Sequence, residues 1–202
     1  MHIGIDFDNT IVSYDSLFHR VALEQGLIPS DLAPNKVAVR DHLRQTGREQ
    51  TWIAMQGEVY GSRMDEAEMY PGFLDFLDWA RQADHGVSIV SHKTRHPFAG
   101  PRYDLHQAAR HWVGTHLLAG DEPRIAESAI YFELTKQEKL VRIGTIGCDV
   151  FIDDLPEILF AELLAPDLRR VLFDPDGNHA PLQDGQFVAV SSWAAAKALL
   201  DV

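Results

Sequence analysis

The chain has 202 residues, which suits one core domain with a small inserted second one, and its composition is that of an ordinary globular protein. Thirty acidic against eighteen basic residues give a net charge of −12, which argues against nucleic acids and anionic membranes as partners. A single cysteine, Cys148, excludes an intrachain disulfide. Together with two aspartates near the N-terminus and no long apolar run, it predicts a cytoplasmic protein.

Short apolar runs, several of them rich in β-branched residues, alternate with helical patterns along most of the chain. The predicted strands are residues 2–6, 87–91, 129–132, 149–153, 170–173 and 187–190. The predicted helices of the same region are residues 72–83, 103–118, 136–146, 155–163 and 192–200. Repeated alternation of buried strands and helices predicts an α/β fold with a doubly wound parallel sheet.

The segment from residue 13 to residue 70 has no strand pattern and shows three helical patterns in succession. In the third, Trp52, Met55 and Val59 share one helix face. Pro71-Gly72 then marks a return to the strand–helix alternation. We predict a helical cap over residues 13–70, inserted into a core of residues 1–12 and 71–202, and expect it to act as a lid that governs substrate choice. The alternative is that these helices simply cover the sheet.

Two pairs of aspartates follow predicted strands, Asp6 with Asp8 and Asp153 with Asp154. The carboxyl ends of parallel strands are where α/β proteins bind ligands, and clustered carboxylates repel each other unless a cation lies between them. Oxygen ligands of this kind suit Mg²⁺. Asp8 or Asp154 alone could instead cap a helix, but two pairs at one edge favour a metal site.

The segment Asp6-Phe7-Asp8-Asn9-Thr10 resembles the first motif of the haloacid dehalogenase-like hydrolases. Ser91, at the end of an apolar strand, resembles the second motif. A lysine at the start of a later helix, Lys139 or alternatively Lys136, resembles the third, and Asp153-Asp154 resembles the fourth. The order of the motifs is right, and the resemblance covers residues 1 to about 165. The insertion after the first motif is where this family carries a helical cap.

The resemblance implies Mg²⁺-dependent hydrolysis of a small phosphomonoester, such as a sugar phosphate or a nucleoside monophosphate. Asp6 would be the nucleophile, Asp8 the general acid and base, and Ser91 and the lysine would bind the transferring oxygens. Asp6, Asp8 and Asp154 would bind the metal, with Asp153 supporting them. Haloacid dehalogenases proper lack an acid at the Asp8 position, which favours phosphoester chemistry. The alternatives are a phosphomutase and a catalytically idle metal-binding partner protein.

Two further expectations concern substrate contacts and the choice of lysine. Thr10, His92 and Lys93 are the predicted substrate-binding residues, because residues 92–96 are locally basic in an acidic chain; the alternative is a solvated loop. Thr135 and Glu138 predict a capping box, which makes Lys136 the first helical residue and Lys139 the fourth. The short connection to Asp154 favours Lys139 as the catalytic lysine, with Lys136 as a surface charge.

Overall fold

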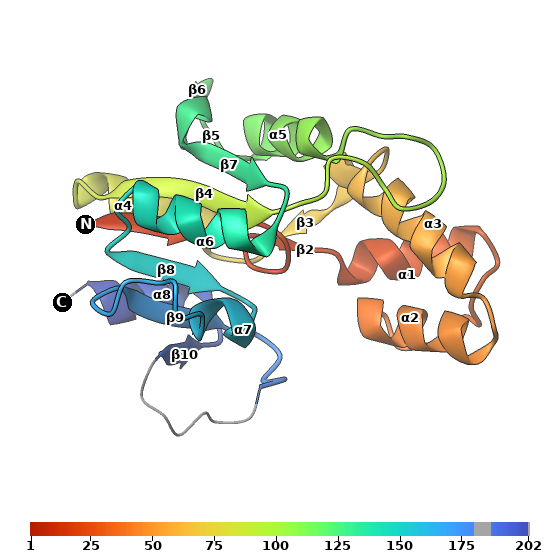
Figure 1. The fold of residues 1–202 in the computed structure, drawn as a ribbon. Helices are drawn as coiled ribbons and strands as arrows, with labels where there is room; N and C mark the ends of the chain where they lie inside the picture. The colour runs from red at the N-terminus through yellow and green to blue at the C-terminus, as the bar shows by residue number, and fades with distance from the viewer. Residues whose placement is uncertain (180–186, 202) are drawn as a thin grey trace. The chain divides into compact units, whose positions relative to one another are not determined.

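The computed structural model describes residues 1–179 and 187–201 (Figure 1). The chain divides into two compact units. The first, called the sheet unit here, consists of Met1–Ile11, Met69–Lys93 and Leu117–Val202, and the second, the helical unit, consists of Val12–Glu68 and Thr94–His116. No helix in the described part of the chain is both long enough and apolar enough to cross a membrane.

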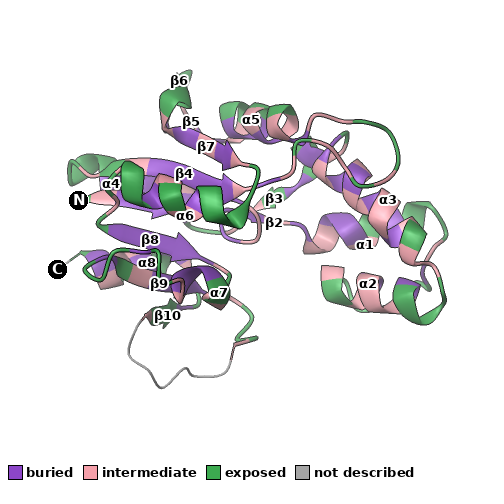
Figure 2. Cartoon of the chain, viewed as in Figure 1, coloured by how far each residue is buried: buried purple, intermediate pink, exposed green. Residues whose placement is uncertain are grey.

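The sheet unit is built on six parallel strands (Figure 1). Their order is β10 (Val188–Val190), β9 (Arg169–Phe173), β8 (Val150–Asp153), β1 (His2–Ile5), β4 (Gly86–His92) and β7 (Ile130–Glu133). All six predicted strands are present, and each neighbouring pair is parallel, so the predicted parallel α/β sheet is confirmed. The central strands β1, β4 and β8 are mostly buried, as Figure 2 shows, which explains their nearly continuous apolar sequences.

Helices cover both faces of this sheet (Figure 1). They are α4 (Phe73–Gln82), α6 (Lys136–Thr145), α7 (Pro156–Leu159) and α8 (Trp193–Leu200). The sheet has an apolar core on each face. Consecutive residues of β9 contribute to different cores, because side chains alternate between the two faces along a strand. Leu172 belongs to a cluster with Ile143 of α6 and Leu159 of α7. Phe173 stacks on Trp193 of α8, with ring centroids 5.1 Å apart. The sheet is therefore doubly wound, as predicted.

One predicted helix of the sheet unit is shorter than expected, and two short strands were not predicted. The helix predicted over residues 155–163 ends at Leu159, because the guanidinium of Arg170 donates to the carbonyls of Leu159 (2.8 Å), Leu164 (3.4 Å) and Ala165 (3.3 Å). A tertiary contact thus replaces the last helical hydrogen bonds. Where the sequence pattern predicts no strand, β5 (Leu118–Ala119) and β6 (Glu122–Pro123) form a two-residue antiparallel pair.

The helical unit contains the three helices predicted between residues 13 and 70. They are α1 (Asp15–Glu24), α2 (Lys36–Gln45) and α3 (Glu49–Tyr60), followed by the short 3₁₀ helix η1 (Met64–Glu66). The predicted apolar face of α3 is confirmed, since Trp52, Met55 and Val59 are 3%, 2% and 0% exposed. The ring of Trp52 lies 4.8 Å from that of Phe18 in α1. Two short strands, β2 (Val12–Ser13) and β3 (Glu68–Met69), pair with each other and were not expected.

A second chain segment belongs to the helical unit, although the sequence pattern places it in the core. It comprises residues 94–104 and helix α5 (Leu105–His116). Glycines on α3 permit its close approach: a Cβ on Gly57 would lie 2.8 Å from Pro97 Cβ, and one on Gly61 would lie 2.6 Å from Tyr103 Cγ. The Trp112 indole of α5 donates to the carbonyl of Ala67 at 2.9 Å.

Candidate active site

The carboxyl ends of three adjacent strands, β8, β1 and β4, meet at one edge of the sheet. Asp6 follows β1 directly, and its N–H donates to the Ile152 carbonyl of β8 at 2.9 Å. Ser91 lies near the end of β4 and Asp153 ends β8. A cavity of about 80 Å³ opens at this edge. It is lined by Asp6, Asp8, Asn9, Ser91, His92, Lys136, Lys139, Asp154, Leu155 and Ile158.

Lys139 lies between two buried carboxylates. Its Nζ is 2.6 Å from Asp6 Oδ1 and 2.6 Å from Asp153 Oδ2, and its side chain is only 2% exposed. Burial opposes the charge on Lys139, but attraction to Asp153 and Asp6 outweighs it and raises the pKa of the ammonium group. Lys139 is therefore a fixed positive charge beside Asp6.

Asp153 is fully buried, and both of its oxygens are engaged. Oδ2 accepts from Lys139, and Oδ1 accepts from the Leu155 N–H at 2.9 Å. Burial raises the pKa of Asp153 to about 6, against the opposing pull of the Lys139 ammonium. The two hydrogen bonds of the Asp153 carboxylate hold Lys139 in place.

Lys136, the alternative catalytic lysine, faces a different partner. The predicted capping box is confirmed, because Thr135 and Glu138 exchange the expected hydrogen bonds at the start of α6. Lys136 is accordingly the first residue of that helix. Its side chain forms an ion pair with Glu157 and is half-exposed, whereas that of Lys139 is buried against Asp6. Both lysines line the cavity, but of the two only Lys139 contacts Asp6 in the described structure.

Three aspartates lie close enough together that they could hold a metal ion. Asp6, Asp153 and Asp154 each offer one carboxylate oxygen, and these oxygens lie within 4.8 Å of one another. Such a set fits the small oxygen shell of Mg²⁺. Because Lys139 and the Leu155 N–H already engage both oxygens of Asp153, Asp6 and Asp154 are better suited to direct coordination. Asp8, a predicted ligand, lies outside this group.

Asn9 is a site residue that the sequence pattern did not single out. Its backbone is in the left-handed region, with φ of 59°, and its side-chain amide donates to Asp154 Oδ2 at 3.4 Å. Asparagine tolerates this conformation better than most residues do. An asparagine in the tight turn after a strand is the signal that could have identified it.

The predicted substrate-binding residues occupy three different environments. Lys93 Nζ lies 2.8 Å from each oxygen of Asp8, its side chain is 4% exposed, and it is not among the residues that line the cavity. His92 lines the cavity, but burial and the charges of Lys139 and Lys136 lower the pKa of its imidazole. Thr10 is fully buried, and its hydroxyl has no hydrogen-bond partner among the described residues.

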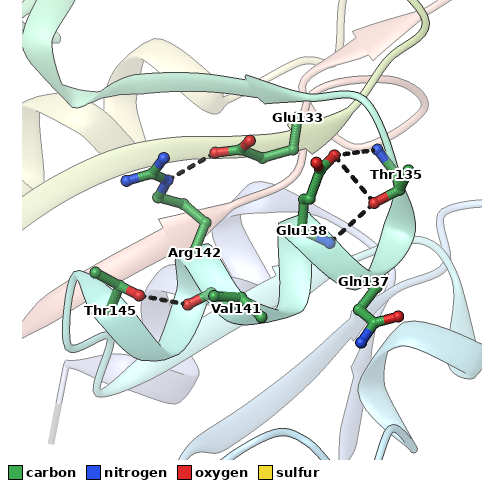
Figure 3. Close-up of a pocket in the computed structure, with 7 residues that line it drawn as sticks. All are labelled: Glu133, Thr135, Gln137, Glu138, Val141, Arg142 and Thr145. Carbon is green, nitrogen blue, oxygen red and sulfur yellow. Dashed lines mark hydrogen bonds and ion pairs between the residues drawn. The ribbon is translucent and has the colours of Figure 1, made fainter.

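A larger hollow of about 620 Å³ lies on the outer side of α6 (Figure 3). Its charged side chains already have partners: Arg142 donates to Glu133 at 2.7 Å, and Glu138 accepts from Thr135 in the capping box. None of the predicted site residues lines it. The small cavity at the strand ends is therefore the better candidate for a reaction site.

No protein-family model and no curated protein sequence matches the chain. Solved structures do match it. A HAD-superfamily hydrolase of Geobacter sulfurreducens is 13% identical with a TM-score of 0.56, covering 98% of this chain and 95% of that one. A HAD family hydrolase of Deinococcus radiodurans with bound phosphate and sodium is 15% identical with a TM-score of 0.53, covering 98% and 94%. A HAD hydrolase of Bacillus subtilis bound to magnesium is 13% identical with a TM-score of 0.51, covering 100% and 98%.

Dehalogenases also occur among the matching structures. At these identities the likeness concerns the fold. It extends over nearly the whole of this chain and of each matching chain. Together with the six-stranded parallel sheet, it shows that the chain has the fold of the haloacid dehalogenase-like hydrolases.

Proposed function

We propose that the protein hydrolyses a small phosphomonoester through a phosphoryl group carried on Asp6. The observation that carries this proposal is the convergence of Asp6, Asp8, Ser91, Lys139 and Asp154 on one cavity at the carboxyl edge of the sheet. Phosphoryl transfer requires positioning and charge neutralisation around the transferring group more than it requires covalent chemistry by the protein. The cavity supplies a carboxylate nucleophile, a hydroxyl and a buried ammonium group for these tasks.

In the first step, an oxygen of Asp6 attacks phosphorus, and the bond from phosphorus to the leaving oxygen breaks. Asp8 in its acid form gives its proton to that oxygen, which leaves as an alcohol. In the second step, a water molecule attacks phosphorus and gives a proton to the Asp8 carboxylate. The bond to Asp6 then breaks, and inorganic phosphate leaves. Ser91 and Lys139 donate hydrogen bonds to the phosphoryl oxygens during both steps.

Asp6 and Asp154 are the residues that would hold Mg²⁺, with Asp153 fixing Lys139 beside them. When bound, the ion would neutralise negative charge on the transferring group. The magnesium and the phosphate bound by the two matching hydrolases support this choice of metal and substrate class.

Carbon–halogen cleavage is the competing reaction, since dehalogenases share the fold. Dehalogenation needs no proton donor for the halide leaving group, whereas an alkoxide leaving group does. Asp8 lines the cavity, where it can serve as that donor. This carboxylate favours phosphoester hydrolysis over dehalogenation.

We also propose that the helical unit selects among substrates. It contains a cavity of about 130 Å³, lined mainly by apolar and aromatic residues of α3 and of the segment that follows Lys93. The lining residues are Ile53, Gln56, Gly57, Tyr60, Thr94, Pro97, Phe98 and Leu105. Such a lining suits an apolar or ring-containing part of a small molecule.

A substrate screen tests the proposed function. Purified protein is assayed for phosphate release from a panel of roughly a hundred phosphometabolites, with Mg²⁺ and with chelator, and for halide release from 2-haloacids. We expect Mg²⁺-dependent phosphate release from a subset of the panel and no halide release. Halide release without phosphatase activity would contradict the proposal.

A further inference from the structure

The side chain of Lys93 is held from several directions, all within the sheet unit. Its Nζ is 2.8 Å from Asp8 Oδ1 and 2.8 Å from Asp8 Oδ2. The same ammonium group lies 5.8 Å from the centroid of the Phe7 ring. The backbone N–H of Lys93 donates to the carbonyl of Glu133, at the end of β7, at 2.9 Å. Lys93 is thus fixed at both ends of its side chain.

This arrangement constrains Asp8 more than a single hydrogen bond would. An ammonium group that lies 2.8 Å from both oxygens restricts the position of the carboxylate more than a contact with one oxygen would. Asp8 is itself partly exposed, at 24% of its side chain, whereas Lys93 is 4% exposed. The buried, anchored partner is therefore the lysine, and the partner at the cavity is the aspartate.

We propose that Lys93 is a positioning residue, which orients the Asp8 carboxyl group toward the leaving oxygen of the substrate. The inference rests on the proposed function, because it assigns Lys93 to the acid–base residue of that reaction. It replaces the expectation that Lys93 clamps the anionic substrate. An acid that must reorient before each proton transfer loses rate, since general acid–base catalysis depends on geometry first.

The two roles predict different kinetics. A substrate clamp lowers KM, and its loss raises KM. A residue that orients the acid affects turnover, and its effect depends on how much the leaving group needs a proton. p-Nitrophenolate is a good leaving group, whereas the alkoxide of glycerol 1-phosphate is a poor one. Loss of Lys93 should therefore damage hydrolysis of glycerol 1-phosphate more than hydrolysis of p-nitrophenyl phosphate.

The test is a double-mutant cycle of Lys93→Met and Asp8→Asn, assayed with both substrates in Mg²⁺. We expect Lys93→Met to lower kcat for glycerol 1-phosphate by roughly ten- to a hundredfold, with KM changed less than about threefold. The loss should be smaller with p-nitrophenyl phosphate, should be partly restored in Lys93→Arg, and should disappear in the Asp8→Asn background. Lys197→Met, which changes a lysine of α8 far along the chain, is the matched control and should behave as wild type.

A raised KM with unchanged kcat, or an equal loss in the Asp8→Asn background, would overturn the assignment. Thermal unfolding of the wild type, Lys93→Met, Asp8→Asn and the double variant gives a readout that does not need activity. If the pair is coupled, the double variant unfolds at about the temperature of the less stable single variant. Additive shifts would overturn the inference even in an inactive protein, whereas absence of phosphatase activity in the wild type would contradict the proposed function instead.

Discussion

The Nζ of Lys139 lies 2.6 Å from Oδ1 of Asp6, although the two residues are 133 positions apart in the sequence. The parallel sheet accounts for this proximity. Asp6 follows β1, Asp153 ends the adjacent strand β8, and Lys139 starts the second turn of α6, which packs against the sheet. The contact places a buried ammonium group beside the proposed nucleophile.

The first prediction separates the two candidate lysines. Lys139→Met should lower turnover by more than about a hundredfold, because removing one positioned donor costs about 3 kcal/mol in the transition state. Lys136→Met should stay close to wild type, since Lys136 is half-exposed and paired with Glu157. Steady-state kinetics on the two variants measure this.

Stability must be followed in parallel. Lys139→Met leaves Asp6 and Asp153 without their shared cation, which costs roughly 3–5 kcal/mol for a buried pair, so assays belong well below its unfolding temperature. A Lys139 variant that is folded and fully active, beside an inactive Lys136 variant, would reverse the assignment.

The second prediction concerns the metal. Activity should require Mg²⁺, and Ca²⁺ should inhibit, because Ca²⁺ adopts a larger and looser oxygen shell than Asp6 and Asp154 provide. Titration of chelated enzyme with each ion, followed by phosphate release, tests this. Asp154→Asn should weaken the apparent Mg²⁺ affinity, whereas undiminished activity in excess chelator would refute the metal site.

The third prediction tests the packing of the central strand. Gly4 in β1 has no room for a methyl group, since a Cβ there would lie 2.6 Å from Cys148 Sγ and 2.7 Å from Phe151 Cδ2. Gly4→Ala should therefore lower the free energy of unfolding by about 1–3 kcal/mol.

Gly144 provides the matched control. It lies in α6, where a methyl group would meet no other described part of the chain within 4 Å, so Gly144→Ala should stabilise the protein by roughly 0.5–1 kcal/mol. Denaturant unfolding of both variants measures the difference. Equal effects of the two substitutions would mean that β1 is not packed as described.

The fourth prediction concerns substrate choice by the helical unit. Phe98 is 87% exposed and lines the cavity of that unit, so Phe98→Ala should change relative kcat/KM values among substrates without lowering stability. Trp52→Ala should instead cost about 3–5 kcal/mol of stability, because Trp52 is buried in the core of the unit. If Phe98→Ala leaves the substrate profile unchanged, this cavity does not select substrates.

The sheet was predictable because strands buried on both faces give continuous apolar runs, as in Val150-Phe151-Ile152. The strands β2, β3, β5 and β6 have two residues each, which is too short for any periodic signal. Helix α7 ends early because of Arg170, whose contact comes from another strand. Likewise, the packing of residues 94–104 depends on the absence of a Cβ at Gly57. This is a tertiary contact, and the local sequence pattern does not predict it.

The candidate site likewise contains some contacts that the sequence could predict and others that it could not. Asp6, Ser91 and Asp153 could be placed together because the ends of parallel strands share one edge. The partner of Lys93 could not be predicted, because Asp8 is 85 positions away and a basic loop after a strand suggests an anion-binding role. Lys93 pairs with Asp8 because a lysine whose side chain is only 4% exposed needs a carboxylate within reach.

Trapping a phosphoryl group on Asp6 is the decisive test of the proposed mechanism. The protein is mixed with Mg²⁺ and excess p-nitrophenyl phosphate, quenched in acid within milliseconds to seconds, digested and analysed by mass spectrometry. We expect a phosphorylated peptide that contains Asp6. It should be absent from Asp6→Asn, which should remain folded but inactive. Phosphate release by Asp6→Asn at a substantial fraction of the wild-type rate, or a phosphoryl group found on another residue, would contradict the mechanism.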